Sequence, residues 1–131
     1  TTGYSSTPWG VFDGCSSLQN TTIPTDVVAI GENAFNSCGK LEKMNIPNSV
    51  EQIGEGAFAC CDGLREISLG EKVRSIGQEA FRDCINLTSI RIPGSVSEIQ
   101  AKTFKNCKKL SSIKIYSTNL KKNKVKKCRV R

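Results

Sequence analysis

The hydrophobic positions of this chain return every 23 residues. The largest of them are aromatic, namely Phe12, Phe35, Phe58, Phe81 and Phe104. A cysteine follows three residues after each phenylalanine, and a leucine follows three residues after each cysteine. A fixed period between about 20 and 50 residues is typical of chains that fold as stacked repeats, in which each repeat packs on its neighbours. We therefore predict a solenoid of about five coils.

Each repeat contains two predicted extended segments. The pattern L-x-x-I-x-I, as in residues 87–92, places β-branched residues two apart at its end and predicts a short strand. Proline follows this strand directly in three copies, where its missing N–H is tolerated, at Pro24, Pro47 and Pro93. The V-x-x-I pattern, as in residues 96–99, predicts a second short extended segment. Because one coil cannot bury its own apolar face, we expect the strands of successive coils to pair in parallel.

The segment between V-x-x-I and the cysteine is expected to contain a turn and a short helix. Glycine follows V-x-x-I in three copies, at Gly31, Gly54 and Gly77. We expect these glycines to supply a positive φ. Ala34, Phe35 and Cys38 are spaced three and four apart, so one or two helical turns would place them on one face. The predicted fold class is thus an α/β repeat solenoid.

The whole pattern, L-x-x-I-x-I-P-x-x-V-x-x-I-G-x-x-A-F-x-x-C, resembles the BspA-like (Treponema-type) leucine-rich repeats of bacterial and protozoan surface proteins. The resemblance runs from about Pro8 to Ile115. It implies a right-handed leucine-rich-repeat coil with a parallel sheet on its concave side. It also implies extracellular display and binding to a host matrix or cell-surface protein. It transfers no particular binding residue, because the repeat motif consists of core positions.

The charge of the chain changes sharply near its end. Residues 1–100 carry seven Lys and Arg against twelve Asp and Glu, whereas residues 101–131 carry twelve Lys and Arg and no acid. The repeat also fails after Ile115, so we divide the chain into a solenoid, 1–115, and a basic C-terminal cap or tail, 116–131. A basic end can attract polyanions. The candidate polyanion patch comprises Lys121, Lys122, Lys124, Lys126, Lys127, Arg129 and Arg131.

The residue types argue against enzymatic, metal and nucleic-acid functions. The chain has no histidine to act as a base for a cysteine nucleophile, and its seven cysteines contain no C-x-x-C pair. We expect the ladder cysteines to be buried and inert and Cys60 and Cys128 to be exposed. No catalytic residue, cofactor or metal is predicted, and no run is long enough to span a membrane. The basic tail lacks interleaved aromatic residues for stacking on bases, Tyr116 being the one candidate.

The outward positions of the L-x-x-I-x-I strands are the candidate binding face. They are Glu42, Lys43, Asn45, Arg65, Glu66, Ser68, Thr88, Ser89, Arg91, Ser111, Ser112 and Lys114. The sequence thus predicts a non-enzymatic, extracellular protein-binding or adhesion module, as a fragment of a larger surface or secreted protein and as a monomer. Two alternatives remain open. The stack could be a structural spacer, or it could bind polyanions through its basic end.

Overall fold

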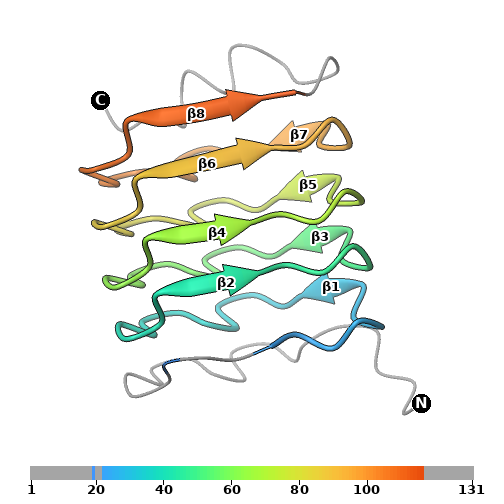
Figure 1. Cartoon of the computed structure of the whole chain (residues 1–131), viewed down its shortest axis with the longest axis horizontal. Helices are drawn as coiled ribbons and strands as arrows, with labels where there is room; N and C mark the ends of the chain where they lie inside the picture. The colour runs from blue at the N-terminus through green and yellow to red at the C-terminus, as the bar shows by residue number, and fades with distance from the viewer. Residues whose placement is uncertain (1–18, 20–21, 117–131) are drawn as a thin grey trace.

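The computed structural model describes residue 19 and residues 22–116 as a stack of similar coils (Figure 1). Each coil contributes two short strands. The L-x-x-I-x-I patterns form the front strands, which are β2 (Lys43–Asn45), β4 (Glu66–Ser68), β6 (Ser89–Ile92) and β8 (Ser112–Ile115). The V-x-x-I patterns form the back strands, which are β1 (Ala29–Ile30), β3 (Gln52–Ile53), β5 (Ser75–Ile76) and β7 (Glu98–Ile99). Both predicted extended segments are confirmed.

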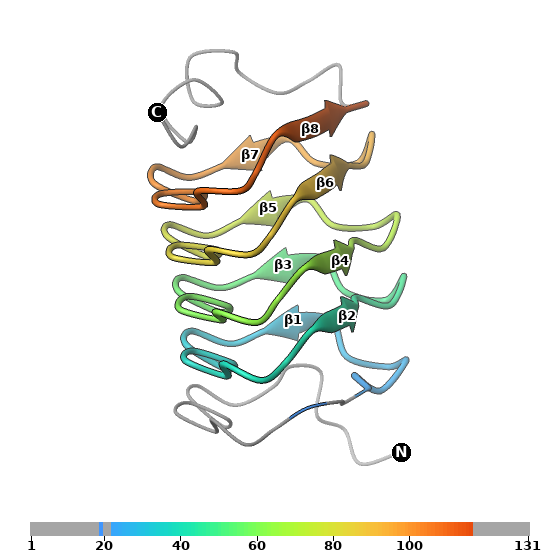
Figure 2. The ribbon, with the colours of Figure 1, turned by 60° about the vertical axis from the view of Figure 1, so that its left-hand side comes forward.

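All strand pairs are parallel and join equivalent positions of successive coils. The back strands form one four-stranded sheet in the order β1-β3-β5-β7, and the front strands pair as β2-β4 and β6-β8. Lys43 lies opposite Glu66 and Ser89 lies opposite Ser112, so the register advances by one repeat. Figure 2 shows the two sets of strands as separate layers along the whole stack. This constant register places like residues in rows that run along the stack.

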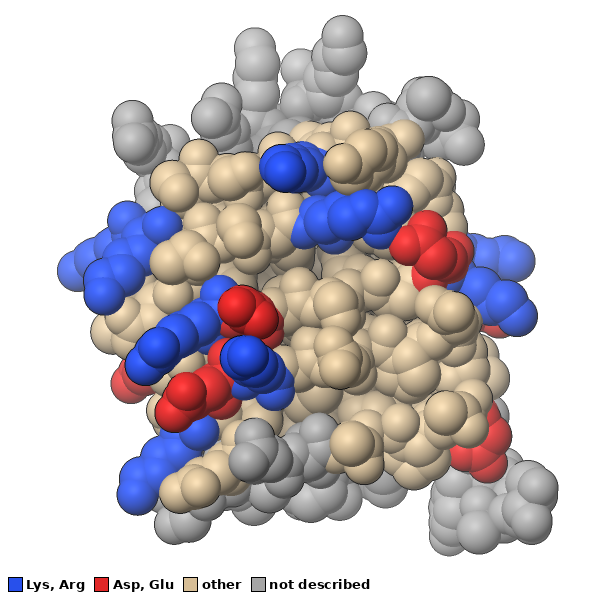
Figure 3. Space-filling view, in the orientation of Figure 1, with Lys and Arg blue, Asp and Glu red and all other residues tan. Residues whose placement is uncertain are grey.

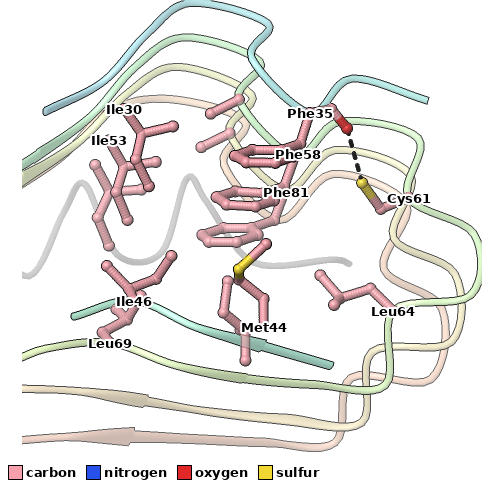
Figure 4. Close-up of a cluster of buried hydrophobic side chains, with 14 of the residues drawn as sticks. Ile30, Phe35, Met44, Ile46, Ile53, Phe58, Cys61, Leu64, Leu69 and Phe81 are labelled. Carbon is pink, nitrogen blue, oxygen red and sulfur yellow. Dashed lines mark hydrogen bonds between the residues drawn. The ribbon is translucent and has the colours of Figure 1, made fainter. Parts of the chain in front are cut away.

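The core is a set of such rows (Figure 4). The rings of Phe35, Phe58, Phe81 and Phe104 stack almost parallel, with centroid separations of 5.2, 5.6 and 5.8 Å. The isoleucines of the back strands and the apolar residues of the front strands close over this column from two sides. Phe12 lies outside the described residues. The predicted core positions are therefore confirmed from Ile23 to Cys107.

The segment that we expected to be helical consists of turns. Within residues 19 and 22–116 the structure contains no helix, so the α part of the predicted α/β class is not confirmed. The backbone N–H groups of this segment donate alternately to the next coil and to their own coil. The N–H of Phe35 donates to Ala57 O of the next coil at 2.8 Å, and the N–H of Asn36 donates to Asn33 O of its own coil at 3.2 Å. A turn with i to i+3 hydrogen bonds has the same apolar spacing as a helical turn, which explains the error.

Positive φ angles occur in this turn segment at two positions of each coil. The first position is taken by Asn33, Gly56, Glu79 and Lys102, and the second by Ser37, Cys60, Asp83 and Asn106. Asn, Asp and Gly adopt this conformation at least cost. At the other residue types, the hydrogen bonds between coils must offset the strain.

The glycines after V-x-x-I have a different role from the predicted one. Gly54 and Gly77 do not have positive φ angles. A Cβ at Gly77 would lie 2.6 Å from the backbone nitrogen of Glu55 and 2.6 Å from the carbonyl carbon of Gly54. A Cβ at Gly54 would meet the coil before it in the same way. Glycine is therefore required here by the close approach of successive backbones.

Candidate functional site

Eight of the twelve predicted face residues lie on the front strands, and the other four lie one residue before them, namely Glu42, Arg65, Thr88 and Ser111. Met44, Ile67 and Ile90 are buried, and the strand residues on either side of each are exposed. Eleven of the twelve are exposed, and Ser112 is half-buried. The outward direction of the eight strand residues follows from the period of two in a strand. Their role in binding stays a prediction.

The rows on the lower half of this face interact along the stack. Lys43 Nζ lies 3.8 Å from a carboxylate oxygen of Glu66, and the hydroxyl of Ser68 donates to Asn45 Oδ1 at 2.6 Å. Both pairs join equivalent positions of successive coils. An exposed ion pair of this kind contributes at most about 1 kcal/mol. These contacts order the side chains of the face more than they stabilise the fold.

Arg91 forms a second cluster near the upper end of the face. Its Nη1 lies 2.7 Å from a carboxylate oxygen of Glu71, and its guanidinium lies 4.6 Å from the centre of the Tyr116 ring. The hydrogen bond to Glu71 raises the pKa of Arg91, so the side chain stays charged. Arginine and tyrosine are enriched among residues that dominate binding energies at protein interfaces.

A groove runs across the coils where the front strands begin. Its volume is about 640 Å³. Most of its lining residues lie in two rows, one just before the leucine position of each coil and one just after it, and Gly39 lies two positions before that leucine. We call it the edge groove, and its lining residues are Gln19, Gly39, Lys40, Glu42, Gly63, Arg65, Asn86, Thr88 and Lys109. Figure 3 shows basic side chains interspersed with acidic ones along this left edge of the front face.

The sequence analysis found only one wall of this groove. Glu42, Arg65 and Thr88 belong to the predicted face, whereas Lys40, Asn86 and Lys109 were missed. These three residues lie one position before the leucine of the repeat, outside the strand pattern. They are spaced by multiples of 23, which was a signal that they lie in one row.

The described ladder cysteines are free, buried thiols. The Sγ of Cys61 donates to Phe35 O at 3.1 Å (Figure 4). The Sγ atoms of Cys84 and Cys107 make the equivalent contacts at 3.1 and 3.0 Å. Burial raises the pKa of Cys61 to about 12 and that of Cys107 to about 11. These thiols therefore stay neutral and have no nucleophilic role at ordinary pH.

Cys60 is less exposed than the sequence predicted. It is half-buried, and its Sγ lies 3.7 Å from Asp83 Oδ2. Partial burial raises its pKa, and Asp83 adds to this effect while Arg82 opposes it. Cys60 is therefore a weakly reactive thiol. Cys15 and Cys128 lie outside the described residues.

Other predicted features fall partly beyond the described chain. The polyanion patch, from Lys121 to Arg131, lies entirely outside the described residues. Within residues 19 and 22–116, no group of three or more His, Cys, Asp or Glu side chains is placed to hold a metal ion. The same part of the chain contains no helix with the length and apolar character of a membrane span.

The chain is similar to known repeat proteins. A family model described as the BspA type leucine rich repeat region matches residues 6–130 in six copies. None of the curated proteins compared with the chain matches it. A leucine-rich repeat protein from Bacteroides ovatus is 39% identical, with a TM-score of 0.79, over 83% of this chain. A leucine rich cell surface protein from Faecalibacterium prausnitzii is 28% identical, with a TM-score of 0.83, over 100% of this chain.

A third solved structure, the pneumococcal vaccine antigen PcpA, is 26% identical with a TM-score of 0.72 over 77% of this chain. The chain spans only 28%, 34% and 25% of the lengths of these three structures. The likeness therefore concerns the repeat stack and leaves most of each larger protein without a counterpart here.

Proposed function

Because the chain belongs to the family of BspA-type leucine-rich repeat proteins, we propose that it is a non-enzymatic protein-binding module. We further propose that it works outside the cell, as part of a larger surface or secreted protein that adheres to a partner. A neighbour described as a cell surface protein and another described as a vaccine antigen support this location.

The observation that carries the proposal is the front face. It presents rows of exposed polar and charged side chains whose positions are fixed by a rigid register rather than by flexible loops. Residues held on regular elements need little ordering when a partner binds, which reduces the entropic cost of association. Arg65, Arg91 and Tyr116 provide the side-chain types that most often dominate such contacts.

A matched pair of double variants tests this function. The wild-type chain is immobilised and exposed to extracellular matrix and serum proteins, and the bound proteins are identified. The front variant carries Arg91→Glu and Lys114→Glu, and the control carries Arg74→Glu and Lys72→Glu. Each pair contains one ion-paired arginine and one exposed lysine, and both change the net charge equally.

We expect the front variant to lose the bound proteins and the control to keep them, with similar melting temperatures for both. Equal loss in the two variants would indicate capture by charge alone and would refute the proposal. If the wild type binds no protein at all, the spacer function becomes the better account.

The five lysines of residues 101–116, which have no acid among them, favour polyanion binding as a second candidate function. Lys102, Lys105, Lys108, Lys109 and Lys114 are all exposed. Binding of heparin that weakens steeply as salt is raised, and that is lost when these lysines are replaced by glutamine, would support this alternative.

A further inference from the structure

Two of the residues that line the edge groove are glycines. Gly39 and Gly63 carry no side chains. Glycine at position 63 is enforced, because a Cβ there would lie 2.5 Å from Gly39 O of the preceding coil. Gly39 differs, since its Cβ would meet no atom of the described residues within 4 Å. The space above Gly39 is therefore open and available to a ligand.

The charges of the groove favour an anionic ligand. The groove is lined by three positive side chains and one negative one, which are Lys40, Arg65 and Lys109 against Glu42. Among the described residues, none of these three cations forms an ion pair, whereas Lys43 and Arg91 of the same face do. Charges that are not neutralised within the protein are those that a partner can complement. Asn86 is held in place because its Nδ2 donates to Asp62 O at 2.6 Å.

The position of Glu42 selects a peptide over a uniformly charged glycan. A sulfated glycan would bring negative charge next to the Glu42 carboxylate as well as to the cations, and like charges in contact are costly. An extended peptide can place acidic side chains at the cations and neutral ones beside Glu42.

We propose that the edge groove binds an extended acidic peptide segment of a partner protein, lying along the stack, with acidic residues four apart facing Lys40 and Lys109. Lys40 and Lys109 lie three coil steps apart, which is about 14 Å at the usual strand spacing of about 4.8 Å. Four residues of extended chain span about 14 Å, and side chains four apart point to the same side. Arg65 lies between the ends and can pair with an acid at the intermediate position.

This proposal rests on the proposed protein-binding function and names the partner's chemistry. The test uses the full chain and two synthetic peptides of identical composition. Both contain two aspartates in a serine and threonine background, either four residues apart or adjacent. Binding is measured by titration of amide NMR signals, in which Gly39 and Gly63 report directly from the lining of the groove. A heparin oligosaccharide serves as the glycan probe.

We expect the peptide with spaced aspartates to bind at least about fivefold more tightly than its isomer, the effect of about one exposed ion pair. Lys40→Glu and Lys109→Glu should each weaken it by about tenfold, because a repulsion replaces an attraction. Lys72→Glu, an exposed lysine in the loop after β4, should change it by less than about twofold. Gly39→Gln keeps every charge, fits the open space and should displace the peptide.

Equal affinity of the two isomers, no binding of either, or unchanged affinity in Gly39→Gln would each overturn the proposal. Binding of heparin that the spaced peptide cannot displace would identify the groove as a glycan site and would also overturn it. These outcomes are separable from failure of the proposed function. If the groove peptide fails while Arg91→Glu with Lys114→Glu still releases captured proteins, the module binds proteins elsewhere on its face.

Discussion

Replacing Gly77 by alanine tests whether backbone contact between coils determines the glycine row. The new Cβ would lie 2.6 Å from backbone atoms of Gly54 and Glu55, closer than any stable contact. The clash involves backbone on both sides, so no side chain can rotate to relieve it. Coils must separate instead, which lengthens hydrogen bonds such as that from Gly77 N to Ile53 O, now 2.7 Å.

The size of the effect can be judged from the last described coil. Gln100 occupies the same row there, and its N–H donates to Ile76 O at 3.0 Å, against 2.7 Å for Gly77. The Phe rings are also farthest apart at this step, at 5.8 Å. A Cβ is thus accommodated by a small separation of the coils. We expect Gly77→Ala to lower the free energy of unfolding by about 2 kcal/mol, within the usual range for overpacking.

Urea denaturation followed by circular dichroism measures this change, and Gly39→Ala is the control. Among the described residues, no atom lies within 4 Å of a Cβ at Gly39, and its φ is not positive, so alanine there should be neutral or stabilise by up to about 1 kcal/mol. If Gly77→Ala is as stable as the wild type, the close approach of the coils is not what requires glycine in this row.

Three further results are expected. Phe58→Ala should cost about 3–5 kcal/mol, and Phe104→Ala should cost less because, among the described residues, its ring stacks on one neighbour only; equal losses in denaturation would contradict a linear stack. Folding raises the pKa of Cys61 from about 9 to about 12, so the stability that the neutral thiol contributes is complete below pH 9 and declines above it by about 1.4 kcal/mol per pH unit. Cys61→Ala should therefore reduce the loss of unfolding free energy above pH 9, and an unchanged dependence on pH would contradict this account. Asp83→Asn should speed alkylation of Cys60, followed by mass spectrometry, because Asp83 raises the pKa of that thiol; the same rate in both proteins would show that Asp83 has no such effect.

The strands and the core could be predicted because their signals are local and repeat in every copy. Met44 lies opposite Ile67 and Ile90 lies opposite Ile113, so the register of the front strands equals the sequence period. The turn segment could not be assigned in the same way. Ala34 and Cys38 are compatible with a helix as well as with successive turns, and the distinction depends on hydrogen bonds to the next coil.

The role of the glycines and the groove also depend on contacts between coils. Glycine satisfies both a positive φ and a close approach, so Gly54 alone cannot distinguish the two. Asn33 and Asp83 were the better sequence signals for positive φ, because these residue types favour it. To predict the groove, three rows of residues would have to be placed in space. Its cations Lys40 and Lys109 lie in a loop that the strand pattern does not cover.

The constant register also determines how such a chain can change in length. Deleting residues 54–76 would join Ile53 to Gly77, which occupies the same row as Gly54, so every core row would stay continuous. A deletion within the coils whose length is not a multiple of 23 residues would move phenylalanine, cysteine and leucine out of their rows. Surface distances along the stack therefore change in whole steps of about 4.8 Å. Loss of that coil would bring Lys40 and Lys109 one step closer, and the peptide spacing that the edge groove accepts would shorten with it.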